Sequence, residues 1–346
     1  MSTNNTLDLQ YCYFVIDERP LCLWDIDLKK RTLEFLESLD PSYFEYVADT
    51  HINNIGDGIE AKSKDSQHAA LTMRTTYSQA LETLFALISA AIQAPYCSQA
   101  WVALYRNHEL RHIIDKIHYH KPLLSQIKHK VLTWSSISEA IFLSLVLEDK
   151  EKEGAIKAGF AQLWSHFAAD FLDNEFTEEY NSIKHGLRVQ PGGFYIAIGS
   201  QKHKGEPATS EKMNLLGKSE FGSGYVAADK IGDSSYHLRM TSHHRNWNPE
   251  DIAWGLHMVS MSISNIQSAL KILNGVPAQE VQFIWPIDLT TLYEPWKRSA
   301  QIGVTSMSGF DIVIPPGFIE TFSKEKIFSD YKAGKVIGLR HLAQFR

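Results

Sequence analysis

The stretch NPEDIAWGLHMVSMSISNIQSALKIL, Asn248–Leu273, carries the clearest structural pattern in the chain. Its large apolar residues recur at alternating spacings of four and three, the period of one buried helix face. They are Ile252, Leu256, Val259, Ile263, Ile266, Leu270 and Leu273. Asn248 suits the N-cap, Pro249 suits the first turn, and Asn274-Gly275 follows the last turn. Because a wide apolar helix face needs other helices to cover it, this stretch predicts a helical core.

Further helices are expected upstream. Helical spacing of apolar residues recurs in the stretches 73–91, 98–116, 135–147 and 154–172, and Pro95 ends the first of them. A short helix opens at Thr177 and ends before the PGG of Pro191–Gly193. The sequence therefore predicts several helices before the long one.

The period changes after Gly193. The runs FYIAI (194–198), FGSGYVAAD (221–229) and YHLRM (236–240) are typical of antiparallel strands joined by polar turns. Short strands are also expected near the two ends, in YCYFVI (11–16), LCLWDIDL (21–28), VQFIW (281–285) and FDIVI (310–314). The expected fold class is mainly α (α+β), a helical bundle with an inserted antiparallel β-hairpin or sheet region and short strands at both termini.

The patterns predict a division of the chain into five parts. These are an acidic N-terminal α/β arm at 1–65, a helical core at 66–190, a β-hairpin region at 191–247, a long amphipathic helix completing the bundle at 248–275, and a mixed C-terminal segment at 276–346.

Composition bounds the function. A chain of 346 residues with 44% hydrophobic residues can bury a large core. Its net charge of −6 excludes a strongly basic nucleic-acid coat, and the first 60 residues hold twelve acidic against four basic residues. Three cysteines, no secretory signal and no apolar run long enough for a bilayer predict a cytoplasmic protein without membrane contact. No phosphate-binding loop, HExxH or CxxC occurs, so no cofactor or metal is expected.

The string EEYNSIKHGLRV, Glu178–Val189, is the first candidate site. On a continuous helix, Asn181, His185 and Arg188 fall at i, i+4 and i+7 and share one face, with Lys184 beside them. An amide, an imidazole and a guanidinium together suit a phosphate or a carboxylate. An imidazole can also transfer a proton near neutral pH.

The segment YNSIKHG, Tyr180–Gly186, resembles the helix motif of HEPN-type proteins, in which Arg and a polar residue precede a His. The resemblance implies a HEPN-like helical bundle, metal-independent ribonuclease chemistry, dimers, and roles as toxins or antiviral effectors in bacteria. Asn181 and His185 match the motif, and Tyr180 stands where catalytic members have Arg. Arg and His in that family assist attack of a ribose 2′-hydroxyl on the neighbouring phosphate.

A second candidate lies in YRNHELRHIIDKIH, Tyr105–His118. Arg106, Asn107 and His112 fit the complete Arg-Asn-x4-His form of the motif, and Arg111 with His118 fits a looser form. The surrounding segment is basic and rich in histidine. We therefore assign His185, Asn181, Arg188, Arg106 and His112 as candidate catalytic residues, and Lys184, Asn107, Arg111 and His118 as candidate RNA- or anion-binding residues.

Two functions remain open. The first is an RNA-binding or metal-independent RNA-cleaving effector in bacterial antiviral defence, restrained by its own acidic N-terminal arm. The alternative is a non-catalytic sensor or scaffold that uses the same helix face to bind a protein or an anionic ligand. Either protein would act as a homodimer or within a larger assembly. In a third interpretation, Asn181 and His185 only satisfy main-chain groups where the helix meets the hairpin.

Overall fold

The computed structural model describes residues 9–126, 131–186, 188–200, 213–232, 236–293 and 308–334, and the single residues 203, 205 and 209. The helices are α1 (Leu28–Ser38), α2 (Ser42–Ile52), α3 (Lys64–Gln93), α4 (Ser98–Leu104), α5 (Asn107–His118), α6 (Trp134–Ile141), α7 (Lys150–Leu172), α8 (Asn174–Lys184), α9 (Pro249–Leu273) and α11 (Lys324–Lys332). The strands are β1 (Gln10–Ile16), β2 (Arg19–Asp25), β3 (Val189–Pro191), β4 (Tyr195–Gly199), β5 (Met213–Lys218), β6 (Gly222–Lys230), β7 (Leu238–Asn246) and β8 (Ser308–Val313).

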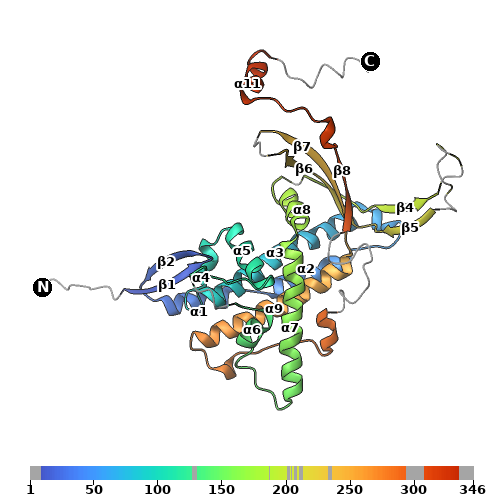
Figure 1. Cartoon of the computed structure of the whole chain (residues 1–346). Helices are drawn as coiled ribbons and strands as arrows, with labels where there is room; N and C mark the ends of the chain where they lie inside the picture. The colour runs from blue at the N-terminus through green and yellow to red at the C-terminus, as the bar shows by residue number, and fades with distance from the viewer. Residues whose placement is uncertain are drawn as a thin grey trace.

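Helices α3 and α9 lie side by side and form the centre of the core (Figure 1). Asn248 caps α9 by accepting a hydrogen bond from the Glu250 N–H, as the sequence predicts. Six of the seven apolar positions predicted for its buried face are at most 1% exposed. The seventh, Leu273, is 48% exposed at the end of the helix. The remaining helices pack around this pair, with α2 against both members and α7 against α6 and α5.

The strands of the described residues form three separate antiparallel sheets at the edges of the helical body. The β1–β2 hairpin lies at one end of the helical layer, and the order β3-β6-β7-β8 forms a four-stranded sheet over α8 (Figure 1). Strands β4 and β5 pair only with each other and project from the body. Strand β8 brings the C-terminal segment back onto β7, so the sheet joins residues about 70 positions apart in sequence.

The expected fold class is wrong. The structure is 56% helical and 17% strand, with several antiparallel sheets, and is an α+β mix rather than a bundle of helices with a small insertion. Three predicted elements also differ, and the first is the helix expected at 135–147, which ends at Ile141. The stretch 98–116 divides into α4 and α5, because the Arg106 N–H binds the Glu109 side chain and starts a new helix. VQFIW is not a strand, because Asn265 and Ser268 of α9 satisfy its main-chain groups instead.

The α3–α9 contact requires a glycine at position 255. A Cβ placed there would lie 2.7 Å from Cε2 of Tyr77, whose ring is fully buried and whose hydroxyl binds Asp170 at 2.9 Å. The ring therefore cannot move aside, and the two helices approach as closely as they do because position 255 lacks a side chain.

We expect Gly255→Ala to lower the free energy of unfolding by about 1–3 kcal/mol, because overpacking outweighs the gain in helix propensity. Gly154→Ala is the matched control, since a Cβ at that helical position meets nothing within 4 Å and should raise stability by up to about 1 kcal/mol. Urea denaturation followed by circular dichroism measures both. Equal stabilisation by the two substitutions would contradict the close contact.

Candidate functional site

Helix α8 is fixed to the core by a buried ion pair. Arg74 of α3 donates from Nε and lies with Nη2 2.8 Å from Oε2 of Glu179, and both side chains are at most 2% exposed. The other carboxylate oxygen of Glu179 accepts from the Ser223 hydroxyl and, at 3.0 Å, from Nε1 of Trp247. The Arg74 guanidinium also stacks over the Phe176 ring, 4.1 Å from its centroid. One carboxylate therefore joins α3, α8, β6 and the segment before α9.

The remaining acidic residues of α8 face the sheet. Glu175 lies 2.8 Å from Nε of Arg245, a β7 residue that is 1% exposed and also binds Asp311 of β8 at 2.7 Å. Burial lowers the pKa of Arg245, but the Asp311 hydrogen bond together with the nearby charges of Glu175 and Asp311 outweighs it, and the net shift is upward. Glu178 approaches His243 at 3.8 Å. Glu175 and Glu179 therefore have arginine partners inside the protein, whereas Glu178 has only the His243 ring beside it.

The C-terminal end of α8 carries the first candidate residues. The helix ends at Lys184, and the His185 N–H binds the Asn181 carbonyl at 3.0 Å. Gly186 then adopts φ = +110°, a left-handed conformation that turns the chain toward β3. Arg188 therefore lies beyond the helix, with its N–H 2.7 Å from the Ser182 carbonyl. The prediction of one continuous helix face through Arg188 is wrong, because the glycine ends the helix two residues earlier.

These residues nevertheless remain together at the α8 end. Lys184, His185 and Arg188 are exposed, and Asn181 is half-buried. Lys184 Nζ lies 5.5 Å from the centroid of the Tyr180 ring. Within the described part of the chain, none of the three exposed side chains forms an ion pair or a side-chain hydrogen bond. We call Asn181, Lys184, His185 and Arg188 the α8 cluster.

Tyr180, the residue at the motif's Arg position, contacts Lys184 of the α8 cluster through its ring and directs its hydroxyl toward α3. Burial raises the pKa of its hydroxyl, which lies near Glu82 and against the Gln79 side chain of α3. Tyr105, directly before Arg106, binds the same Glu82 at 3.0 Å. The two candidate segments therefore approach each other through their tyrosines rather than through their cationic residues.

Arg111 connects α5 to the junction of α7 and α8. It donates hydrogen bonds to the Phe171 and Leu172 carbonyls at 2.6 and 2.7 Å, to the Thr177 hydroxyl at 2.5 Å, and to Asn174. Because these hydrogen bonds occupy its donors, Arg111 holds α5 against the α7–α8 junction. The geometry does not support the prediction that Arg111 contacts RNA. Burial lowers the pKa of the guanidinium.

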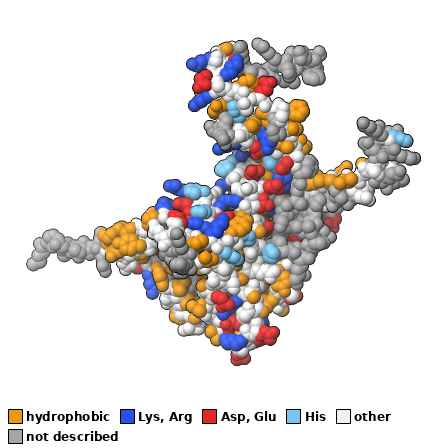
Figure 2. All heavy atoms as spheres, in the orientation of Figure 1, with side chains coloured by type: hydrophobic (Ala, Val, Ile, Leu, Met, Phe, Trp, Pro, Cys, Tyr) orange, Lys and Arg blue, Asp and Glu red, His pale blue; other side chains and the backbone are white. Residues whose placement is uncertain are grey.

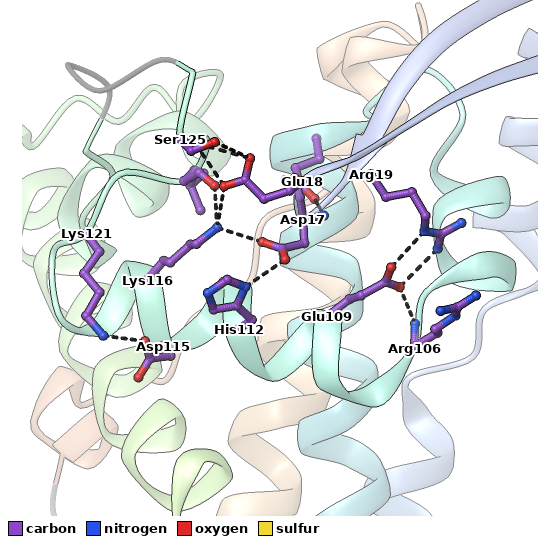
Figure 3. A network of polar contacts seen from close by, with 12 residues as sticks. Asp17, Glu18, Arg19, Arg106, Glu109, His112, Asp115, Lys116, Lys121 and Ser125 are labelled. Atoms are coloured by element: carbon purple, nitrogen blue, oxygen red, sulfur yellow. Dashed lines mark hydrogen bonds and ion pairs between the residues drawn. The ribbon is translucent and has the colours of Figure 1, made fainter.

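The opposite side of α5 meets the turn of the β1–β2 hairpin (Figure 3). Asp17 adopts φ = +53° and places its carboxylate 2.7 Å from Nδ1 of His112 and 2.9 Å from Nζ of Lys116. Glu18 binds the same Lys116 nitrogen at 3.0 Å and accepts from the Ser125 N–H at 2.9 Å. Burial lowers the pKa of Lys116, but these carboxylates outweigh it and the net shift is upward.

Other α5 residues take separate positions. Arg106 and Asn107 are exposed at the start of the helix, where Arg19 pairs with Glu109 at 2.8 Å (Figure 3). His118 is half-buried near the other end, and its Nδ1 has no hydrogen-bond partner among the described residues. His112 thus faces the hairpin, whereas its neighbour Arg111 faces α8. The proposed catalytic residues of the two segments do not meet in one cleft.

The sequence reasoning missed the polar residues that organise these surfaces. Asp17 and Glu18 form the turn between two short apolar runs, and Lys116 stands four residues after His112, a spacing that places both on one helix face. The sequence therefore contained enough information to predict the contact between this turn and α5. Arg74, Glu179 and Arg245 carried no local signal, since their pairing depends on contacts more than 60 residues apart.

Comparisons with known proteins identify no relative. No family model matches the chain, and searches of curated proteins and of solved structures find no significant match. In the residues that the structure describes, no helix has the length and apolar character needed to cross a membrane. Across the same residues, no three His, Cys, Asp or Glu side chains gather as a metal ion would require.

We expect Glu179→Ala to lower the free energy of unfolding by about 3–5 kcal/mol, because Arg74 would remain charged and buried without a partner. The double variant Arg74→Met/Glu179→Met should lose less free energy of unfolding than this single variant, because it leaves no unpaired charge in the core. Urea denaturation provides the measurement. A double variant at least as unstable as Glu179→Ala would show that the charge pairing is not what fixes α8.

The α5–α7 contact should weaken on acidification. Burial lowers the pKa of His118 and of His166, and each ring lies near another histidine, His120 and His118 respectively. A lowered pKa means that the unfolded chain binds more protons, so this stability is present above about pH 6.5 and is lost as the pH falls through the folded pKa. We expect His118→Gln/His166→Gln to show a smaller loss of Tm between pH 7.5 and 5.5 than the unchanged protein. An identical loss would contradict this assignment.

Proposed function

We propose that the protein binds RNA, without cleaving it, through the α8 cluster. The observation that carries the proposal is the separation of charge on α8. Glu175 and Glu179 pair with Arg245 and Arg74, and Glu178 lies beside His243, while the cationic end of the helix faces solvent without an acidic partner in the described residues. Exposed cations and amide donors in one place suit a phosphate backbone. The resemblance of YNSIKHG to HEPN-type proteins favours the same ligand.

Binding is favoured over cleavage by the arrangement around His185. Catalysis of the HEPN type needs a fixed guanidinium beside the histidine, and Tyr180 occupies that position with its ring against α3. Arg188 follows the Gly186 turn and leaves the helix face that carries Asn181. The cluster therefore offers charge and hydrogen-bond donors without a preorganised acid–base pair.

The proposal includes a cytoplasmic location and a homodimer or larger assembly. The chain has only three cysteines, an odd and sparse set, which favours a reducing compartment; none is in a disulfide, and the Cys97 thiol lies against that of Cys12. An acidic protein surface is the competing ligand, since it offers carboxylates in place of phosphates.

We expect Lys184→Ala/Arg188→Ala to weaken binding of a fluorescein-labelled single-stranded RNA about tenfold in low salt. For single strands, removing two phosphate contacts should make the slope of log K against log salt less steep by about 1.4. Fluorescence anisotropy over a salt series measures both. Lys150→Ala is the control, because that exposed lysine lies on α7 and pairs with Glu153.

An unchanged slope in the α8 variant would contradict RNA binding at this cluster. Retained binding of an acidic peptide with no binding of RNA would assign the cluster to a protein partner instead.

Metal-independent RNA cleavage is a second candidate, and the His112–Asp17 contact is the observation that favours it. A carboxylate 2.7 Å from Nδ1 orients a histidine as a general base, and the His112 ring is half exposed. Arg106 and Asn107 complete the motif upstream. Cyclic-phosphate products formed in the presence of a chelator, and lost in His112→Ala but not in His185→Ala, would establish it. Absence of these products from the unchanged protein would exclude it.

A further inference from the structure

The two edges of the β1–β2 hairpin differ in how well they are protected. Strand β1, QYCYFVI, contains no charged residue, no glycine and no proline. Strand β2, RPLCLWD, has a charged residue at each end and Pro20, which lacks an N–H. Charges and proline are the usual protection of an edge strand against pairing with another chain. The β1 edge therefore lacks the protection that β2 has.

The hairpin register shows which main-chain groups face the β1 edge. Asp17 and Glu18 form a two-residue turn between the paired residues Ile16 and Arg19. Hydrogen-bonded and non-hydrogen-bonded pairs then alternate, so Tyr11, Tyr13 and Val15 fall in non-hydrogen-bonded pairs and direct their N–H and C=O groups outward. The 4.8 Å separation of the Tyr11 and Trp24 rings agrees with the close approach of such a pair. In the described part of the chain, no other element forms a main-chain hydrogen bond with β1.

Two cavities lie along the same strand. The first has a volume of about 380 Å³, and its lining combines Val15 with Leu124, Ala140, Leu143 and Leu273. The second, about 340 Å³, is lined by Gln10 and Cys12 together with Leu273. Both cavities involve β1 and the end of α9, and the lining of neither includes a β2 residue. No charged side chain lines the first cavity, and Lys29 is the one charged side chain in the lining of the second.

The surface around the strand is apolar as well. Figure 2 shows hydrophobic side chains gathered over the end of the molecule where Figure 1 places the hairpin. Tyr11, Tyr13 and Trp24 are 53%, 76% and 59% exposed, and Leu143 at the first cavity is 76% exposed. An exposed apolar face of this kind commonly marks an interaction site.

We propose that the β1 edge is a docking site for an extended, uncharged peptide segment of a partner protein. The segment adds to the hairpin as a third strand and pairs its main chain with Tyr11, Tyr13 and Val15. Its alternate apolar side chains enter the cavities beside β1. In this mode, main-chain hydrogen bonds supply affinity and the cavities supply preference for particular side chains.

A flexible segment fits this site better than the β1 strand of a second copy. A strand that docks here must offer apolar side chains to the cavities of its host. In β1 the inward side chains Phe14 and Ile16 are 5% and 0% exposed, because they are already buried in their own core. The occupant is therefore a segment that is free to become extended on binding.

A fluorescein-labelled probe peptide, Thr-Val-Thr-Val-Thr-Val-Thr, tests the proposal by fluorescence anisotropy on the full chain. Two N-methylated versions carry the methyl groups on alternate residues, so that each blocks one edge of the added strand. We expect one version to bind at least tenfold more weakly, because it loses the main-chain hydrogen bonds to β1, while the other binds as the parent peptide does. Equal weakening by both versions, or no binding of the parent peptide, would overturn strand addition.

Variants of the protein separate the edge from the cavity. Tyr13→Pro removes an outward N–H without breaking the β1–β2 ladder and should weaken binding roughly tenfold, whereas Tyr13→Thr keeps that N–H and should bind nearly as the unchanged protein does. Ala140→Phe, at an exposed position of the cavity wall, should also weaken binding. A dimer in sedimentation velocity that Tyr13→Pro dissociates would overturn the proposal in favour of a second copy.

Discussion

The position of α8 and of the β3-β6-β7-β8 sheet relative to α3 depends on the buried contact between Arg74 and Glu179. A buried charged pair needs further contacts to offset its desolvation. Ser223 and Trp247 donate to the second carboxylate oxygen, and the Arg74 guanidinium stacks over Phe176, while Nη1 of Arg74 has no hydrogen-bond partner among the described residues. The pair thereby determines where the sheet and α8 sit relative to α3. Because Glu179 lies on α8, this contact also fixes the position of the exposed end of α8 and of the turn at Gly186.

Much of the helical pattern was predictable, because it rests on local periodicity. The α9 helix and its Asn248 cap follow from residues within one segment, and so do the β1 and β2 strands with their alternating faces. The overall class was not predicted correctly. The pairing of β7 with β8 and the separate pairing of β4 with β5 depend on which strands meet in space. The spacing of apolar residues within one segment does not identify the strand that will pair with it.

The candidate site was predictable only in part, for the same reason. Asn181, Lys184 and His185 share the last turn of α8 as their spacing indicates, but a glycine one residue later redirects the chain before Arg188. The sequence suggested that Arg111 contacts an anion. In the structure it donates to carbonyl groups at the end of α7, which have no hydrogen-bond donor within the helix. Whether a cation is free to bind a ligand depends on tertiary neighbours that a motif does not contain.

Arg111 and His112 are adjacent in sequence and yet contact opposite parts of the protein, the α7–α8 junction and the hairpin turn. Helix α5 therefore separates the two surfaces by only one helix diameter. Between these two contacts the apolar face of α5, with Leu110, Ile113 and Ile117, is fully buried in the same core as α3 and α9, so α5 holds the hairpin turn and the α7–α8 junction in fixed positions. A substitution that displaces α5 would therefore disturb both surfaces at once.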